Sequence, residues 1–379
     1  MSESLYLFNK NRMQPWNELP LLPIHEQLYQ TVEVYEQLGK AKAALGRLQG
    51  RSIAIPNQGL LINSISLQEA KASSAIENIF TTDDELYKAY SEESTQTEYQ
   101  NSPSKEILKA REALWNGYNY LKDKSGFNKE YFIKIFQEIK ETTDELRLPF
   151  IETVIRQGGI GGNAGQVSYT PPRGEGILEN KLDNLIDFVN DDERYKIDSL
   201  LKMAIAHFQF EAIHPFRDGN GRTGRIFNIH YLTKKGLLDL PILFLSRYIM
   251  DNKDDYYSGL MGVSQRGDWK TWILYMLRAV EVTANITYQK INDILSAKDS
   301  MLAYIKAKDK KLRKSEQLVD MLFTQPYIKV KHLTDVKVYS EVTAREYLNK
   351  LSDLRIVEKK SIEGRHYYLN QQLYTILSE

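Results

Sequence analysis

Twelve residues decide how this sequence is interpreted: His214-Pro215-Phe216-Arg217-Asp218-Gly219-Asn220-Gly221-Arg222-Thr223-Gly224-Arg225. They lie between two stretches of helical periodicity, so they predict a loop that runs into the N-terminus of a helix. The glycine and asparagine residues at 219–221 tolerate positive φ, which lets successive main-chain N–H groups converge on one concavity. Together with the positive end of the following helix, this pattern predicts a phosphate-binding site.

The charged side chains of the same stretch suit a polyphosphate. Arg222 and Arg225 are three residues apart on one helical face, where two guanidinium groups can bind neighbouring phosphate oxygens. Asp218 would repel those phosphates unless a cation lay between them, so we expect Mg²⁺ at this carboxylate. His214 can act as a general base near neutral pH. Each residue alone has an ordinary structural explanation, but their combination indicates a catalytic site.

The stretch resembles the motif of the Fic-domain family and matches it at every defined position. The resemblance implies a mostly helical core that transfers AMP from ATP to a hydroxyl side chain of a target protein. By motif position, His214 would deprotonate the target Ser, Thr or Tyr, and Asp218 would hold Mg²⁺ between the α- and β-phosphates. Asn220 and Arg222 would contact those phosphates, and Arg225 the γ-phosphate. The full set of ATP-binding positions would be Asp218, Gly219, Asn220, Gly221, Arg222, Thr223, Gly224 and Arg225.

Two further features of this resemblance concern chemistry and control. Family members that use other cofactors depart from the Gly-Asn-Gly-Arg-x-x-Arg pattern, so the intact pattern favours ATP with transfer at the α-phosphorus. Far upstream, Ser73-Ser74-Ala75-Ile76-Glu77-Asn78 resembles the inhibitory motif of Fic proteins whose inhibitory helix precedes the core. The resemblance implies that Ser73, Glu77 and Asn78 are inhibitory. Glu77 would occupy Arg225, so that ATP binds poorly or with its α-phosphorus misaligned.

Two segments around the motif are candidates for substrate contacts. Residues 154–170 contain two short strand-like runs with a glycine-rich connection, which predicts a β-hairpin. By resemblance this hairpin is the flap over the active site, whose edge could pair with an extended target segment. Downstream, the nucleoside pocket is expected, by analogy, to involve Asp251 or Asn252 together with Tyr256 and Tyr257. Packing in the core explains the two tyrosines equally well.

The remaining chain predicts a mainly α protein in three parts. An N-terminal helical region (1–104) carries the inhibitory motif and ends in a polar surface loop at 91–104. A Fic core follows at 105–300. Residues 310–379 predict a winged helix-turn-helix domain, with helices at 317–323 and 330–333, a third helix capped by Ser340, and a hairpin at 356–369. In the first two parts, helices are expected at 24–46, 60–74, 105–122, 129–141, 178–189, 198–212, 222–235, 255–263 and 269–297.

Composition restricts the class of protein. The 379 residues include 50 Lys and Arg, 50 Asp and Glu, and no Cys. The absence of cysteine excludes disulfides, thiolate catalysis and Cys-ligated zinc. No apolar run approaches the ~20 residues of a membrane span, and the N-terminus lacks the features of a secretory signal. We therefore expect a cytoplasmic protein without a membrane anchor.

Alternatives to AMP transfer remain open at this stage. The same site could remove AMP from a modified target or transfer another nucleotide or a phosphoryl group. The C-terminal domain could bind DNA through Arg345, Asn349 and Lys350 on its recognition helix and through a basic wing. However, residues 327–379 carry a net charge of only +2, from nine Lys/Arg and seven Asp/Glu, and DNA-binding domains usually show a stronger basic bias. Self-modification and a homodimer that stabilises the inhibited form are further expectations from the resemblance.

Overall fold

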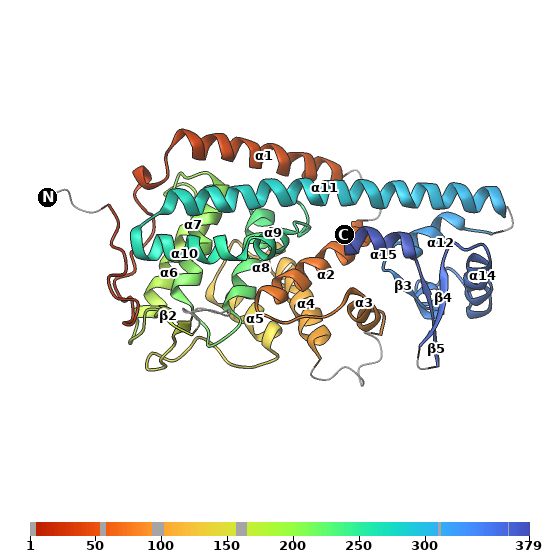
Figure 1. Ribbon diagram of the computed structural model, residues 1–379, viewed down its shortest axis with the longest axis horizontal. Helices are drawn as coiled ribbons and strands as arrows, with labels where there is room; N and C mark the ends of the chain where they lie inside the picture. The colour runs from red at the N-terminus through yellow and green to blue at the C-terminus, as the bar shows by residue number, and fades with distance from the viewer. Residues whose placement is uncertain (1–4, 54–57, 93–101, 157–164, 310–311, 363) are drawn as a thin grey trace.

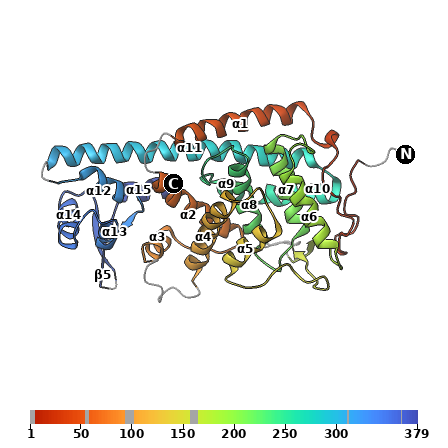
Figure 2. The ribbon, with the colours of Figure 1, turned by 180° about the vertical axis from the view of Figure 1, so that it is seen from behind.

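The structure is a computed structural model that describes residues 5–53, 58–92, 102–156, 165–309, 312–362 and 364–379. It is mainly helical, which confirms the predicted fold class. The molecule is elongated, and a long helix, α11 (Trp269–Lys308), runs along most of its length (Figure 1). Helix α1 (Val32–Ile53) lies along α11 in both views, and a small domain occupies the C-terminal end of α11 (Figure 2). None of the described helices has both the length and the apolar character needed to cross a bilayer.

The central helix of the core is α7 (Ser199–Ile213), which is mostly apolar and buried on all sides along almost its whole length. A helix without a polar face must be covered on every side. The helices packed around it and its neighbours are α4 (Pro103–Lys122), α5 (Lys129–Lys140), α6 (Ile177–Asn190), α8 (Asn220–Lys234), α9 (Leu245–Asp251) and α10 (Lys253–Arg266). The region before α4 adds the 3₁₀ turn η1 (Glu26–Leu28), α2 (Gln58–Ile76) and α3 (Asp83–Glu92).

Most of the predicted helices are confirmed, and the differences have local causes. Helix α1 begins at Val32 rather than Ile24, because residues 26–28 form a separate 3₁₀ turn that ends at Tyr29, whose φ of −141° is not helical. Helix α11 continues to Lys308, so the predicted core boundary at residue 300 falls inside it. The surface loop predicted at 91–104 is wrong at its start, since Ser91 and Glu92 are the buried end of α3. Residues 93–101 of that loop lie outside the described residues.

The hairpin predicted at 154–170 is confirmed as a pair of antiparallel strands, and its role as a flap stays a prediction. Strand β1 (Ile155–Arg156) pairs antiparallel with β2 (Val167–Tyr169), with Ile155 opposite Tyr169. Most of its glycine-rich connection, residues 157–164, lies outside the described part of the chain. The N-terminal arm supports the end of β2, because the main-chain N–H of Trp16 donates to the carbonyl of Thr170 at 3.1 Å.

The C-terminal domain contains the three helices and the hairpin that the sequence predicts. These are α12 (Ser315–Leu322), α13 (Val330–Asp335), α14 (Glu341–Asp353), β4 (Glu358–Ile362) and β5 (Arg365–Leu369). Ser340 caps α14 by accepting a hydrogen bond from the N–H of Thr343. A short strand, β3 (Tyr327–Ile328), extends the sheet in the order β3-β5-β4, and α15 (Gln371–Ser378) ends the chain. Neither was predicted.

The basic residues that were considered for DNA binding are largely used within the chain. Arg345 pairs with Glu341 at 2.7 Å, Lys350 pairs with Asp309, and Lys359 donates to Asn349 at 2.8 Å. These three cations therefore already have partners within the chain, which a phosphate backbone would have to replace.

The C-terminal domain is anchored to the N-terminal region through Glu92 at the end of α3. The Glu92 side chain is only 2% exposed, and it accepts hydrogen bonds from Lys329 and Tyr367. Arg365 lies 3.4 Å from its second oxygen. A buried carboxylate is tolerated only when donors surround it. Glu92 is therefore the main polar connection between α3 and the C-terminal sheet.

We expect Glu92→Ala to destabilise the folded protein by about 3 kcal/mol, because the two basic groups around Glu92 lose their shared anion. Urea unfolding, followed by circular dichroism, measures the change. The control is Glu341→Ala, which removes an exposed ion pair within α14 and should cost less than about 1 kcal/mol. Equal effects of the two substitutions would contradict the anchoring role of Glu92.

Candidate active site

The end of α7 places His214 at the centre of the site. His214 is the C-terminal cap of α7, with φ 51° and ψ 60°, and its N–H donates to the carbonyl of Phe210 at 3.0 Å. The next loop is anchored by Phe216, which is fully buried and stacks on Phe136 with ring centres 4.2 Å apart. Burial, followed by the positive charge of Arg147, lowers the pKa of His214 to about 4. The imidazole is therefore neutral near pH 7 and able to accept a proton.

The start of α8 forms the predicted anion-binding loop. Gly219 has φ 74°, a left-handed conformation that favours glycine, and it precedes the first helical residue. Both ends of the Asn220 amide bond to the main chain of Phe216 at 2.9 Å, and the Thr223 hydroxyl donates to the carbonyl of Gly219. These two side chains thus hold the loop in shape. The first-turn N–H groups of α8 are the groups suited to bind an anion.

Asp218 lies at the exposed edge of this loop. Its side chain is 70% exposed, and one carboxylate oxygen lies 2.6 Å from Lys140 Nζ while the other accepts from the N–H of Gly219. Partial burial opposes ionisation of Asp218, but Lys140 holds its pKa below the usual value. An accessible, ionised carboxylate beside a phosphate site fits the oxygen ligands that Mg²⁺ prefers. Lys140 would have to give way to the ion.

The two motif arginines are almost completely buried, and each is bound to a carboxylate from another element. Arg222 Nη1 lies 3.1 Å from a Glu106 oxygen, at the start of α4. Arg225 is 1% exposed and makes three contacts with the end of α2. Its Nε donates to the Ser73 hydroxyl at 2.9 Å, and its Nη2 donates to the Ser73 carbonyl at 2.9 Å and to Glu77 Oε1 at 2.8 Å.

Glu77 lies directly over the anion-binding loop. A Cβ atom at Gly221 would overlap both the Glu77 carboxylate and the Arg225 guanidinium, so only glycine leaves room for this contact. Burial opposes ionisation of Glu77, but Arg225, with Arg222 and Lys253, holds its pKa below the usual value. The carboxylate is therefore charged, and it occupies the space beside Arg225.

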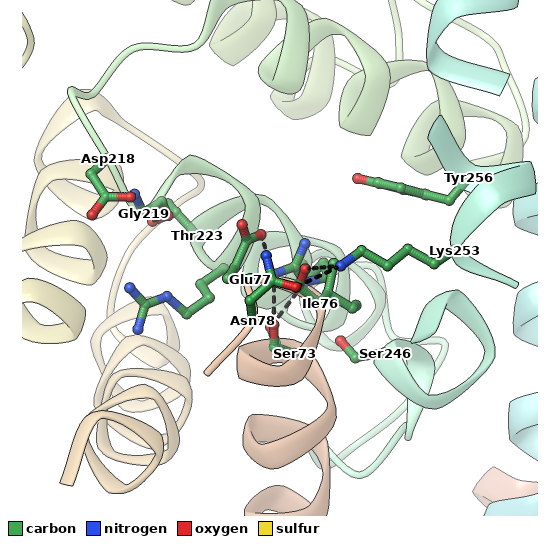
Figure 3. Close-up of polar contacts among 12 residues, drawn as sticks. Ser73, Ile76, Glu77, Asn78, Asp218, Gly219, Thr223, Ser246, Lys253 and Tyr256 are labelled. Atoms are coloured by element: carbon green, nitrogen blue, oxygen red, sulfur yellow. Dashed lines mark hydrogen bonds and ion pairs between the residues drawn. The ribbon is translucent and has the colours of Figure 1, made fainter. Parts of the chain in front are cut away.

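The end of α2 is fixed by a residue that has no place in the predicted motifs. Lys253, the first residue of α10, donates to the carbonyl of Ile76 at 2.6 Å and lies 3.4 Å from the side-chain oxygen of Asn78 (Figure 3). Asn78 has φ 63°, which ends the helix. The predicted inhibitory residues Ser73, Glu77 and Asn78 thus meet Arg225 and Lys253 in one cluster.

The structure separates the residues predicted for the nucleoside pocket. Tyr256 is buried in the core, where its hydroxyl lies 2.9 Å from His207 Nε2, so packing explains it. Tyr257 is 39% exposed and lies close enough to the site that burial and Glu77 raise its pKa to about 12. Asp251 pairs with Arg247 across one turn of α9. Of these three, Tyr257 is the residue that is both partly exposed and close to Glu77 and Arg225, so its role in a nucleoside pocket stays a prediction.

Sequence analysis missed several residues that shape the site. These are Glu106, Lys140, Arg147, Glu211 and Lys253, and all but Glu211 come from elements distant in sequence from the motif. Glu211 lies on α7, and desolvation of its carboxyl group raises its pKa to about 8. Gly224 packs against Glu211 and Phe210, so this glycine and Thr223 serve the internal packing of α8.

Comparison with known families agrees with this geometry. Residues 126–232 match the Fic/DOC family, and residues 35–119 match its N-terminal domain. Residues 298–373 match the C-terminal domain of SoFic-like protein adenylyltransferases. The chain belongs to the Fic/DOC family.

Two curated relatives of this Fic protein match it over limited segments. It is 30% identical over 115 residues to the protein adenylyltransferase fic-1 of Caenorhabditis elegans, covering 30% of this chain and 21% of that protein. It is 36% identical over 73 residues to a probable protein adenylyltransferase of Aquifex aeolicus, covering 19% and 22% of the respective chains. The matches therefore span about a fifth of each relative's length.

Solved structures support the fold over a longer range. A Fic family protein from Desulfovibrio desulfuricans G20 has a TM-score of 0.55 at 18% identity, covering 92% of this chain and 98% of that one. Fic-1 from C. elegans has a TM-score of 0.50 at 18% identity, covering 67% and 71%. At these identities the likeness concerns the fold alone.

We expect Gly224→Ala to destabilise the core by about 1–3 kcal/mol, because the added methyl group would overlap the buried Glu211 carboxyl group. The midpoint of thermal unfolding measures this effect. The matched control is Gly39→Ala in α1, where a methyl group meets nothing within 4 Å and should stabilise the helix by up to about 1 kcal/mol. A Gly224→Ala protein as stable as the control would show that Glu211 does not lie against α8.

Proposed function

We propose that this Fic protein transfers AMP from ATP to hydroxyl side chains of target proteins, and that Glu77 restrains the transfer. The observation that carries the proposal is the state of Arg225. This guanidinium belongs to a phosphate-binding loop, yet Ser73 and Glu77 hold it, while a neutral His214 lies at the other end of the same loop. The curated relatives named protein adenylyltransferases support the same reaction class.

The proposed step is a single displacement at the α-phosphorus. The target hydroxyl oxygen forms a bond to this phosphorus, the bond from the phosphorus to the β-phosphate oxygen breaks, and pyrophosphate leaves. His214 accepts the hydroxyl proton. Arg222 and Arg225 bind phosphate oxygens, and the start of α8 provides main-chain N–H donors. Asp218 would hold Mg²⁺, which neutralises phosphate charge when bound.

The flap is the element best placed to present the target. Strand β2 ends in Tyr169, whose hydroxyl donates to the carbonyl of Ala212 at 2.8 Å, two residues before His214. A target segment that added a strand to the flap would therefore lie beside the base. In this proposal the target supplies the hydroxyl of a Ser, Thr or Tyr side chain.

The proposed restraint is a competition for one guanidinium. The Glu77 carboxylate and the γ-phosphate would both bind Arg225, and the two anions would repel each other if both were present. Binding of ATP in a reactive position therefore requires Glu77 to leave. Because Arg225 is buried, the free energy of that exchange is larger than for an exposed ion pair.

We expect Glu77→Gly to increase AMP incorporation on the order of ten- to a hundredfold, because the γ-phosphate no longer competes with a carboxylate. The assay incubates each protein with Mg²⁺ and α-³²P-ATP, with the protein itself and a cell extract as acceptors. Adding His214→Ala to Glu77→Gly should abolish incorporation. A parallel reaction with γ-³²P-ATP should leave the protein unlabelled.

Glu141→Gly is the matched control for this experiment. It removes an exposed carboxylate that pairs with Lys105. The main chain of Glu141 already has φ 48°, a conformation that glycine accepts. Its labelling should equal that of the wild type. Absence of label from α-³²P-ATP in the Glu77→Gly protein, or transfer of label from γ-³²P-ATP, would contradict the proposed reaction.

A further inference from the structure

Arg147 is a buried arginine whose guanidinium contacts only main-chain carbonyls among the hydrogen bonds of the described residues. It lies between α5 and the flap and is 3% exposed. Its Nε donates to the carbonyl of His214 at 2.8 Å, and its Nη2 donates to the carbonyls of Ile213, at 3.1 Å, and Pro172. Burying a cation in this way costs free energy, so the carbonyls must compensate with well-placed hydrogen bonds.

These contacts complete the C-terminal end of α7. The last carbonyls of a helix have no partners within it, and a cation there is favoured by the helix dipole. In this protein the carbonyl of Ala212 accepts from the Tyr169 hydroxyl, while Arg147 binds the next two. The main-chain N–H of Arg147 also donates to the carbonyl of Pro215 at 2.9 Å. Hydrogen bonds from the flap and from the segment that precedes the flap thus hold residues 212–215 in place.

The contact with the His214 carbonyl acts on a strained residue. A histidine at φ 51° carries a conformational cost on the order of 1 kcal/mol or more, and the surrounding structure must impose that conformation. The Nε of Arg147 fixes the carbonyl of this residue directly. The same guanidinium reaches Pro172, which follows the flap strand β2, so it connects the flap to the catalytic loop.

We propose that Arg147 is a positioning residue for AMP transfer: it ties the end of the flap to the backbone of His214 and so fixes the base relative to a flap-bound hydroxyl. This inference rests on the proposed function. A near-attack geometry is sensitive to displacements of about 1 Å, which can reduce the rate on the order of a hundredfold. Removing the planar fork of Arg147 would release both attachments at once.

The charge of Arg147 has a separate and measurable effect. Besides burial, the positive charge of Arg147 disfavours protonation of His214. A hydrogen bond to the main chain of Glu211 and the negative charges of Glu77 and Asp218 favour protonation. Loss of the Arg147 charge should raise the pKa of His214, although burial keeps it below the usual value for histidine. Lysine at position 147 would retain the positive charge, but its ammonium group lacks the planar fork of donors that arginine provides.

The experiment compares Arg147→Gln and Arg147→Lys in the Glu77→Gly protein, with Arg173→Gln as the control. Arg173 is the neighbouring flap-end arginine, and its side chain pairs with Glu152 at 3.5 Å near the surface. Three quantities are measured: the labelling rate at saturating ATP, the ATP concentration that gives half of this rate, and the pKa of His214. The pKa comes from an NMR titration of the imidazole, assigned by comparison with His214→Ala.

We expect the labelling rate to fall about 10- to 100-fold in both Arg147 variants, with the half-saturating ATP concentration unchanged within about threefold. The pKa of His214 should rise in Arg147→Gln and stay low in Arg147→Lys. Arg173→Gln should change none of the three quantities. This pattern separates positioning, which both variants lose, from charge, which only glutamine removes.

Other outcomes overturn the inference. Unchanged rates in both Arg147 variants would show that the tether does not position the base. Loss of the helical circular dichroism spectrum in both Arg147 variants would show that Arg147 contributes only to the stability of the fold. Failure of the parent Glu77→Gly protein to incorporate AMP would instead contradict the proposed function, and it is recognised before any Arg147 variant is compared.

Discussion

The buried guanidinium of Arg225 is the constraint on which the arrangement of the site depends. A cation that is 1% exposed needs an anion or several acceptors nearby, and the end of α2 provides both through Ser73 and Glu77. The same contacts cover the anion-binding loop at Gly221. Under the proposed function, the interaction that stabilises Arg225 is therefore also the one that the γ-phosphate would replace.

The position of α2 in the chain links this interaction to distant parts of the molecule. Lys253 binds the end of α2 from α10, and only residues 79–82 separate Asn78 from the start of α3. Helix α3 is in turn held against the C-terminal sheet by Glu92. A displacement of Glu77 that moved the main chain at the end of α2 would therefore act on residues 79–82 and on α3.

The sequence predicts well those parts of the site that are continuous in the chain. The loop from His214 to Arg225, the flap strands and most helices follow from local patterns, and the resemblance around Glu77 indicates the contact with Arg225. The partners of Arg222, Asp218 and His214 could not be predicted, because they lie 116, 78 and 67 residues away. Tyr256 and Tyr257 are adjacent, and only their packing on α10 shows that the first is buried and the second exposed.

Each charged side chain that is predicted to bind MgATP forms an ion pair with another side chain of the protein. The pairs are Arg225 with Glu77, Arg222 with Glu106, and Asp218 with Lys140. Under the proposed function, nucleotide binding would exchange these ion pairs, and the three exchanges would differ in free energy. Asp218 is largely exposed, so water and salt weaken its pair with Lys140. The Glu106 carboxylate is 49% exposed and that of Glu77 35%, and both pair with a buried arginine. The Glu77 pair combines a buried cation with two further bonds from Ser73. Under the proposed function, the exchange at Arg225 is therefore the one expected to cost the most free energy, because it breaks the Glu77 pair together with two hydrogen bonds to Ser73.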